Sequence, residues 1–308
     1  MLWYAGRVVQ RAKGKCGAQE VLVVPVVIAA AGFRVNDCSA PKGRSRRRRW
    51  LLIGCGAAPA VVAACLAYSL LETRWLRTVP IDLSQSSASL HIVHISDLHY
   101  KGDRRYLAEV VRRINGLRPD FVCFTGDVAE RRGYLEEALE VMGQIRAPVF
   151  GVPGNHDHWR GDLGQTDRLF RKAGGRLLVN TWTSWEKAGA RVILVGIDDM
   201  TAGRPMPEWA FPPLGACEGA KVVVLCHSPA IFDRMGDRRF DLGLAGHSHG
   251  GQVRLPLLGA LTVPRNTGCY SMGLYRTSRG VIYVNPGIGT WWLPLRFLCR
   301  PEVTLIRL

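Results

Sequence analysis

The sequence repeats one short pattern five times: an apolar run that ends in histidine, aspartate or asparagine. The runs are typical of short buried strands, and the ends of such strands are where loops can bring polar side chains together. One aspartate or histidine in such a place is more often structural than functional, but five blocks in order along one domain indicate a shared site. The blocks are HISDLH (94–99), FTGD (124–127), PGNHD (153–157), VLCH (224–227) and LAGHSHGG (244–251).

The residue types at these ends are those that bind divalent metal ions. Asp97 and His99 stand two residues apart, so on an extended backbone they lie on one side and can bind one ion together. Gly126 forms a turn that delivers Asp127. Carboxylate, imidazole and amide ligands suit two hard or borderline ions, such as manganese, iron or zinc. The blocks therefore predict a site for two divalent metal ions.

The order DLH, GD, GNHD, H and GHSH resembles the calcineurin-like metallophosphoesterase superfamily. The stretches GHSHGGQVRLP, YVNPGIG and PEVTLIRL are similar to its membrane-associated bacterial YkuE/YaeI-type branch, from about residue 88 to the C-terminus. The resemblance implies two overlapping sets of ligands. One metal is held by Asp97, His99, Asp127 and His249, and Asp127 bridges to a second metal held also by Asn155, His227 and His247.

The resemblance also implies a catalytic pair, His156 and Asp157. His156 stands beside the metals without binding them, and Asp157 orients it. Glu130 occupies a place where many members carry aspartate, and it is not a ligand in the family pattern.

These residues predict a hydrolase of phosphoric esters, with a phosphodiesterase as the preferred form. Two cations a few ångströms apart lower the pKa of a bridging water, supply hydroxide near neutral pH and neutralise phosphate oxygens. Imidazole titrates near working pH, so His156 is the expected general acid. A non-catalytic interaction module on the same fold is the alternative of another class, and the complete set of ligands disfavours it.

The periodicity predicts a mixed α/β (α+β) fold, and the resemblance makes it a four-layer αββα metallophosphoesterase sandwich. The apolar stretch before residue 72 adds an N-terminal transmembrane helix to this fold. Residues 89–308 form the metallophosphoesterase domain. Strands are expected at 90–95, 121–124, 149–152, 191–196, 221–226, 241–245, 281–284 and 302–307. Helices are expected over 103–117 and from Leu135 to Ile145, where apolar residues recur at helical spacing.

The N-terminal part combines a basic run with an apolar stretch. Residues 1–80 hold thirteen of the 41 lysines and arginines but three of the 25 acidic residues, so most of the net charge of +16 lies there. Residues 1–49 form a poorly organised basic segment, residues 50–71 a transmembrane anchor or export signal, and residues 72–88 a connector. The 21 uncharged residues from Leu51 to Leu71 would span about 30 Å as a helix, the thickness of a bilayer core.

Arg46 to Arg49 precede the apolar stretch and place the N-terminus inside, with the catalytic domain outside the bacterial inner membrane. The same run resembles a twin-arginine export signal. The predicted partners are the membrane and a phosphoester on a lipid or envelope polymer, with no nucleic acid. The alternative is UDP-2,3-diacylglucosamine pyrophosphate hydrolysis in lipid A synthesis, which requires the cytoplasmic face.

A last apolar segment, TWWLPLRFL (290–298), allows two interpretations. The preferred one is that its residues pack as core under the last strand. The other is that Pro294 keeps the segment in a loop, where Trp291 and Trp292 beside Arg296 suit a bilayer interface.

Overall fold

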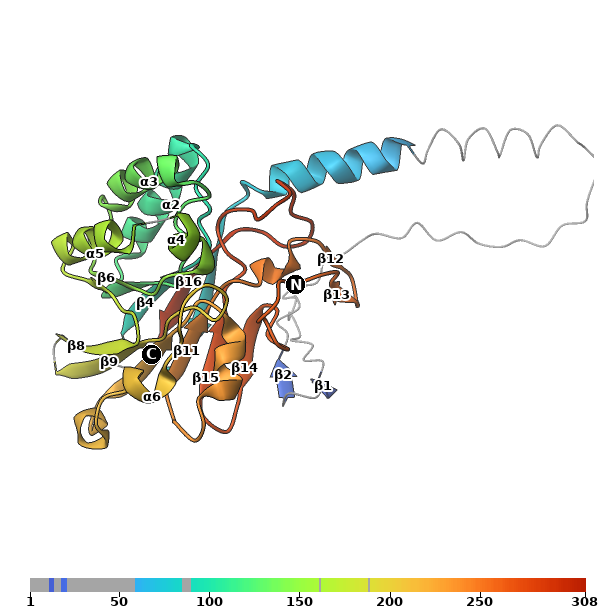
Figure 1. Ribbon diagram of the computed structural model, residues 1–308. Helices are drawn as coiled ribbons and strands as arrows, with labels where there is room; N and C mark the ends of the chain where they lie inside the picture. The colour runs from blue at the N-terminus through green and yellow to red at the C-terminus, as the bar shows by residue number, and fades with distance from the viewer. Residues whose placement is uncertain (1–10, 14–17, 21–58, 85–89, 161, 188) are drawn as a thin grey trace, which may run out of the picture.

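Two β-sheets packed face to face form the body of the protein (Figure 1). The computed structural model describes residues 11–13, 18–20, 59–84, 90–160, 162–187 and 189–308. The first sheet has six strands in the order β3 (Arg77–Asp82), β16 (Glu302–Arg307), β4 (His91–Ile95), β5 (Phe121–Phe124), β6 (Val149–Gly151) and β7 (Arg176–Leu177).

The second sheet has eight strands and contains a central parallel part. Strands β9, β10, β11 and β15 run parallel to one another, whereas β8 and β14 are antiparallel to their neighbours. The order is β1 (Arg11–Lys13), β2 (Ala18–Glu20), β14 (Gly273–Arg276), β15 (Val281–Val284), β11 (Leu242–Ala245), β10 (Lys221–Leu225), β9 (Ala190–Gly196) and β8 (Thr181–Lys187). A separate hairpin consists of β12 (Arg254–Leu255) and β13 (Gly259–Ala260).

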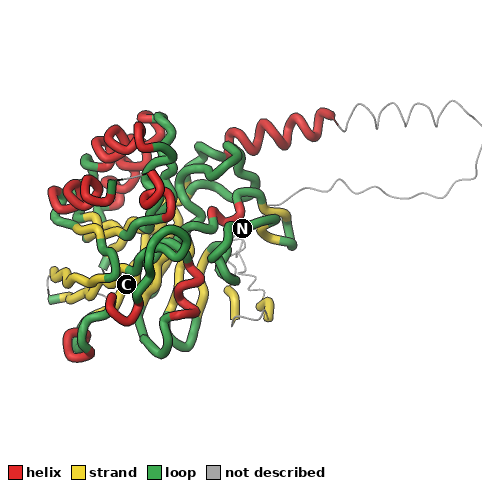
Figure 2. The backbone as a smooth tube through the Cα atoms, viewed as in Figure 1, coloured by secondary structure: helices red, strands yellow, loops and turns green. Residues whose placement is uncertain are grey.

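Helices lie mainly on the outer face of the six-stranded sheet, where Figure 2 shows them grouped at one side of the strands. They are α2 (Arg104–Leu117), α3 (Leu135–Met142), α4 (Asn155–Arg160) and α5 (Leu163–Lys172). The outer face of the eight-stranded sheet is covered by short elements, among them α6 (Pro207–Ala210) and the 3₁₀ helix η3 (Pro229–Arg234). The mixed α/β fold is confirmed. The four-layer sandwich was expected to carry helices on both outer faces, but the outer face of the eight-stranded sheet is covered by short helices and loops.

Alternation along the strands explains why the protein has three separate apolar layers. In β5, Val122 and Phe124 face the helices, whereas Phe121 and Cys123 face the other sheet. Successive side chains of a strand point to opposite sides, so a strand that is apolar throughout is buried on both faces. The central strands are therefore held between two cores, which fixes the positions of their ends.

The expected strands and helices lie where the periodicity predicted them, within one to three residues. Strand β3 was missed, because it lies in the segment interpreted as a connector; it pairs in parallel with β16 at the edge of the six-stranded sheet. Strand β8 was also missed, because its sequence TWTSWEK is polar and only partly buried.

The predicted membrane segment lies partly outside the described residues, which begin again at residue 59. Residues 59–72 are helical. Among the residues described, no helix is both long and apolar enough to cross a membrane. Most of the basic segment 1–49 also lies outside the described residues.

The segment 290–298 is a loop, and its preferred interpretation as core is wrong. Trp292 is 77% exposed, and Trp291 and Leu293 are exposed as well. Arg296 is the exception: it is fully buried, and its guanidinium donates to the carbonyls of Pro286 and Cys299. A buried cation rather than an apolar side chain therefore anchors the loop.

Candidate metal centre

The predicted ligand residues follow the carboxyl ends of strands in both sheets. Strands β4, β5 and β6 are parallel, as are β10 and β11, so the carboxyl ends within each sheet lie at one edge. Because the two sheets pack face to face, these edges meet. The seven residues, called the ligand cluster below, are Asp97, His99, Asp127, Asn155, His227, His247 and His249, none more than 7% exposed.

Five members of the ligand cluster have a left-handed backbone. Left-handed φ angles are uncommon outside glycine, cost about 1–3 kcal/mol each and gather at functional sites. Backbone hydrogen bonds hold the turn after β4. The N–H of Asp97 donates to the carbonyl of Gly126 over 2.9 Å, and the N–H of His99 donates to the backbone carbonyl of Asp127 over 3.0 Å. The five residues are Asp97, His99, Asp127, His247 and His249, with φ between 39° and 64°.

Two glycines are required because side chains of the cluster lie where a Cβ atom would be. A Cβ on Gly154 would lie 2.2 Å from Asp127 Oδ1. A Cβ on Gly246 would lie 2.3 Å from Asp97 Oδ2. Gly154 therefore lets the turn after β6 approach the carboxylate that follows the neighbouring strand β5, and Gly246 lets the turn after β11 approach a carboxylate of the other sheet.

One half of the cluster gathers around His99. Its Nε2 atom lies 3.2 Å from His249 Nε2 and 3.3 Å from Asp127 Oδ2. His249 Nε2 in turn lies 3.4 Å from Asp97 Oδ1. These four side chains are the predicted ligands of the first metal, and their donor atoms face one another.

The other half gathers around His227. Its Nε2 atom lies 3.1 Å from His247 Nδ1, 3.2 Å from Asn155 Oδ1 and 3.3 Å from Asp127 Oδ2. Asp127 Oδ2 is thus equally distant from His99 Nε2 and His227 Nε2. The carboxylate predicted to be shared does lie between the two halves.

The donor set fits divalent metal ions. Pairs of imidazole nitrogens face each other at 3.1–3.2 Å together with carboxylate oxygens, which is the arrangement of ligands turned toward a common cation. Three groups place one ligand atom from each residue within 4.8 Å of one another: Asp97, His99 and His249; His99, Asp127 and His156; and Asp97, Asp127 and His227.

Burial and the facing charges together set the charge states of the cluster. Burial lowers the pKa values of His247 and His249, which favours the neutral imidazole that binds metal. At His227 the facing Asp127 outweighs burial and raises the pKa well above its usual value. Burial alone would raise the pKa of Asp127, but the facing His227 and His99 outweigh it and hold that pKa well below its usual range. Asp127 therefore remains an ionised carboxylate in a site with little water.

Hydrogen bonds to backbone carbonyls fix the orientation of two histidines of the cluster. His227 Nδ1 donates to the carbonyl of Thr125 over 2.6 Å, and His247 Nε2 donates to the carbonyl of Arg265 over 2.7 Å. Each hydrogen bond turns the opposite ring nitrogen into the cluster, where it would be the atom that binds a metal ion. Neither backbone acceptor had a signal in the sequence.

Glu130 lies outside the cluster but contacts it, and this contact was not predicted from the sequence. Its carboxylate accepts from His99 Nδ1 over 2.8 Å and lies 3.6 Å from His156 Nδ1. Burial would raise the pKa of Glu130, but the hydrogen bond and charge of His99 prevail and lower it to about 2. Its position three residues after Asp127, on the same turn, was the signal that could have indicated this contact.

His156 lies at the edge of the cluster. Its ring packs edge-on against His99 at 4.6 Å, and Arg160 Nη1 lies 3.4 Å from its Nδ1 atom. Burial lowers the pKa of His156 to about 4. The residue predicted as general acid is therefore beside the ligand cluster, with a carboxylate and a guanidinium close to its ring.

Asp157 makes contacts other than the predicted one with His156. Its carboxylate accepts from the backbone N–H groups of Asp127, Val128 and Gly154, over 2.7–2.9 Å. Burial and the charge of Asp127 raise the pKa of Asp157 to about 6. Asp157 thus joins the turn after β5 to the turn after β6, and the groups near His156 are Glu130 and Arg160.

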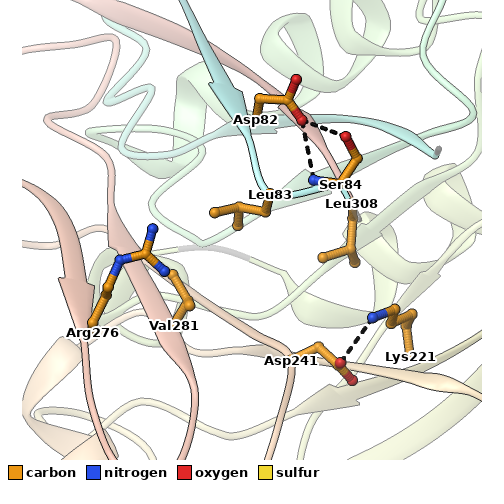
Figure 3. A pocket seen from close by; sticks show the side chains of 8 residues that line it. All are labelled: Asp82, Leu83, Ser84, Lys221, Asp241, Arg276, Val281 and Leu308. Atoms are coloured by element: carbon orange, nitrogen blue, oxygen red, sulfur yellow. Dashed lines mark hydrogen bonds and ion pairs between the residues drawn. The ribbon is translucent and has the colours of Figure 1, made fainter. Parts of the chain in front are cut away.

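A cavity of about 290 Å³ lies away from the cluster (Figure 3). Lys221 and Val281 line it from the amino ends of β10 and β15, and Lys221 Nζ pairs with Asp241 at 3.2 Å. The cluster is at the carboxyl ends of the same parallel sheet, so this cavity is at the opposite edge.

Comparisons with known proteins agree with this geometry. Residues 90–251, which include the whole cluster, match the calcineurin-like phosphoesterase family. The metallophosphoesterase YkuE of Bacillus subtilis is 32% identical over 70% of this chain and 76% of its own length. The phosphodiesterase YaeI of Escherichia coli is 29% identical over 85% of this chain and 98% of its own length. A transmembrane protein with a metallophosphoesterase domain from Danio rerio is 31% identical over 74% of this chain and 55% of its own length.

Replacing Asp127 with alanine should remove bound metal, because its carboxylate lies between both halves of the cluster. Metal content can be measured by mass spectrometry after loading with Mn²⁺ and desalting. We expect two ions per wild-type chain and at most one in Asp127→Ala. Asp82→Ala, which changes an exposed carboxylate remote from the cluster, is the matched control and should keep both. Two ions in Asp127→Ala would refute the shared-ligand assignment.

Proposed function

Since the chain belongs to the calcineurin-like phosphoesterase family and is a hydrolase of phosphoric esters, we propose that it cleaves a phosphodiester at the ligand cluster with two metal ions. The observation that carries the proposal is the position of Asp127, whose Oδ2 atom lies 3.3 Å from both His99 and His227. One carboxylate between two groups of imidazoles is what two neighbouring cations require. A non-catalytic module would have no need to keep all seven donors buried.

Two overlapping sets of side chains would hold the ions, which would be manganese, iron or zinc. When bound, the ions would supply a hydroxide nucleophile near neutral pH and offset the negative charge of the phosphate. The first set is Asp97, His99, Asp127 and His249, and the second is Asp127, Asn155, His227 and His247.

His156 would donate the proton to the departing oxygen. Its pKa of about 4 reflects burial, and an anionic phosphate beside the ring would raise that pKa because it stabilises the imidazolium. Glu130 acts in the same direction through its charge, whereas Arg160 opposes it. Arg160 also donates to the carboxylate and the carbonyl of Glu130, which holds both groups next to the imidazole.

The substrate we propose is a phosphodiester on a lipid or an envelope polymer. The 21 uncharged residues 51–71 support a membrane location, as do relatives named as transmembrane proteins. We propose that residues 50–71 anchor the chain or direct its export, with the catalytic domain outside the inner membrane. A pyrophosphate such as UDP-2,3-diacylglucosamine is the alternative substrate, and it would require the cytoplasmic side.

The purified full chain loaded with Mn²⁺ should hydrolyse bis(p-nitrophenyl) phosphate faster than p-nitrophenyl phosphate. His156→Ala should slow turnover of a diester with a poor alkoxide leaving group by about 10²–10⁴-fold, the range for lost general acid catalysis. The loss should be smaller with p-nitrophenolate, which leaves with less need of a proton. The wild type and the variant should contain the same amount of metal.

The matched control is His91→Ala, which removes an exposed histidine at the start of β4. It should leave both rates unchanged. Equal losses in His156→Ala for good and poor leaving groups would argue against proton donation. Absence of turnover by the metal-loaded wild type on diesters, monoesters and pyrophosphates alike would contradict the proposed function.

The side of the membrane can be read from fusions placed after Leu308. We expect an active alkaline phosphatase fusion, because Arg46 to Arg49 hold the N-terminus inside and place the C-terminus outside. A green fluorescent protein fusion that is exported by the general secretory route should not fluoresce. Replacing all four arginines with glutamine should weaken this preference. A fluorescent fusion with inactive phosphatase would reverse the orientation and favour the pyrophosphate substrate.

A further inference from the structure

Exposed apolar side chains gather on three segments that lie far apart in the sequence. The segments are the helix over residues 59–72, the hairpin β12–β13 and the loop 291–298. Leu257 at the tip of the hairpin is fully exposed, and Leu258 and Trp292 are each 77% exposed. Large apolar side chains at such exposure, gathered on one side of a protein, are typical of a surface that something covers.

The helix over residues 59–72 has no polar side that could face water. Residues 59–71 carry no charged side chain. The exposed residues Val61, Leu66 and Leu71 lie on different sides of the helix, at a spacing of about 100° per residue. A helix that is apolar all round belongs in a protein core or in lipid. The uncharged stretch continues back to Leu51, so the same character extends toward the N-terminus.

The end of this helix is fixed to the loop 291–298 and the residue that follows it. The Glu72 carboxylate accepts from the N–H groups of Leu298 and Cys299, over 2.7 and 2.9 Å. The backbone N–H of Arg296 donates to the carbonyl of Ser69 over 3.0 Å. Figure 1 shows the helix lying over this loop. Wherever the apolar helix enters a bilayer, the loop is held next to that point.

The hairpin β12–β13 joins the same surface through the backbone of Phe297. Phe297 N–H donates to the Gln252 carbonyl over 2.8 Å, and Arg254 N–H donates to the Phe297 carbonyl over 2.9 Å. Figure 1 shows β12 and β13 beside the loop, on the side of the protein from which the helix projects. Leu257 and Leu258 therefore project from a support that is attached to the loop.

This surface borders the ligand cluster directly. The Trp291 ring stacks over the His249 ring, with centroids 6.5 Å apart and an angle of 20° between the planes. Gln252 accepts from Trp291 N–H and donates to the carbonyl of Leu293 over 3.1 Å. A molecule bound at Trp292 is therefore close to the proposed metal site, because the neighbouring Trp291 stacks on His249.

Cationic and aromatic groups complete the surface. The Arg300 guanidinium lies over the ring of Trp75, 4.3 Å from its centroid, and Trp75 is itself exposed just after the helix. Tryptophan with a neighbouring cation is typical of the interface between hydrocarbon and lipid headgroups, where the ring is buried and the cation meets phosphate.

We propose that the helix 59–72, the hairpin tip at Leu257–Leu258 and the loop at Trp291–Leu293 together form a bilayer-binding surface for anionic phospholipid. The helix enters the bilayer, and the two loops lie in its interface and hold the ligand cluster at headgroup level. A phosphodiester on a membrane lipid then reaches the cluster without leaving the bilayer. This last step rests on the proposed phosphoesterase function, whereas the contact with lipid does not.

Photo-crosslinking of the full chain tests the surface without depending on activity. The chain is reconstituted in vesicles of phosphatidylglycerol and phosphatidylcholine, with p-benzoylphenylalanine in place of Leu257, Trp292 or Trp209. Trp209 in α6 is 74% exposed, nearly as much as Trp292, and Figure 1 shows α6 far from the helix over residues 59–72, so Trp209 is the matched control. We expect lipid adducts at 257 and 292 and none at 209.

Absence of lipid adducts at 257 and 292 would overturn the proposal. Equal adducts at all three positions would overturn it too, because the lipid contact would then be unspecific. Crosslinked dimers of the chain in place of lipid adducts would show that a second copy covers the surface.

A rate comparison separates this proposal from the proposed function. Trp292→Ser combined with Leu257→Ser should lower hydrolysis of a vesicle-embedded phosphodiester by about tenfold, since each lost apolar contact weakens lipid binding. Hydrolysis of bis(p-nitrophenyl) phosphate should be unchanged, and Trp209→Ser should change neither rate. Equal rates of the double variant and wild type on the vesicle substrate would contradict the surface. A wild type inactive on both substrates would contradict the function, while the crosslinks would still report the lipid contact.

Discussion

The Asp127 carboxylate is the group on which the arrangement around the site depends. It is almost fully buried between His99 and His227, and an isolated buried carboxylate would cost several kcal/mol. The surrounding turns hold Asp127 in place. Its backbone N–H donates to the Asp157 carboxylate, and the Oδ1 atom of Asp127 accepts from the backbone N–H of His156. Left-handed backbone at five residues of the cluster costs about 1–3 kcal/mol each, and the binding of two cations that share Asp127 would help to offset this cost.

The two packed sheets explain how such a site can be rigid. Ligand residues follow buried parallel strands, so their Cα positions are set by two cores rather than by flexible loops. Hydrogen bonds to the backbone carbonyls of Thr125 and Arg265 then fix the orientations of the His227 and His247 rings. The buried strands thus fix the positions of the short turns, and the turns carry the side chains that could bind metal, as is usual at the carboxyl ends of parallel strands.

The sequence predicted the parts of the structure that depend on local pattern. Strands such as β5 and β10 are apolar throughout, and α2 has regular apolar spacing, so their bounds followed from periodicity. Strand β8 escaped because its sequence TWTSWEK is mainly polar and none of its residues is fully buried. The ligand cluster was predictable because the residue types themselves are distinctive.

Contacts made across the fold could not be predicted in the same way. Asp157 was expected to orient His156, but it binds three backbone N–H groups from two different turns, and no local pattern encodes that choice. Trp292 was expected in the core by hydrophobicity alone, whereas the buried Arg296 and the Glu72 carboxylate keep its loop at the surface. Both cases depend on hydrogen bonds between segments distant in sequence.

Anomalous X-ray diffraction from crystals of the Mn²⁺-loaded chain tests the central claim most directly. Two anomalous peaks are expected about 3.5–4 Å apart, one on each side of Asp127 Oδ2, with His99 and His249 next to one peak and His227 and His247 next to the other. A single peak, or peaks that do not share Asp127, would contradict the account.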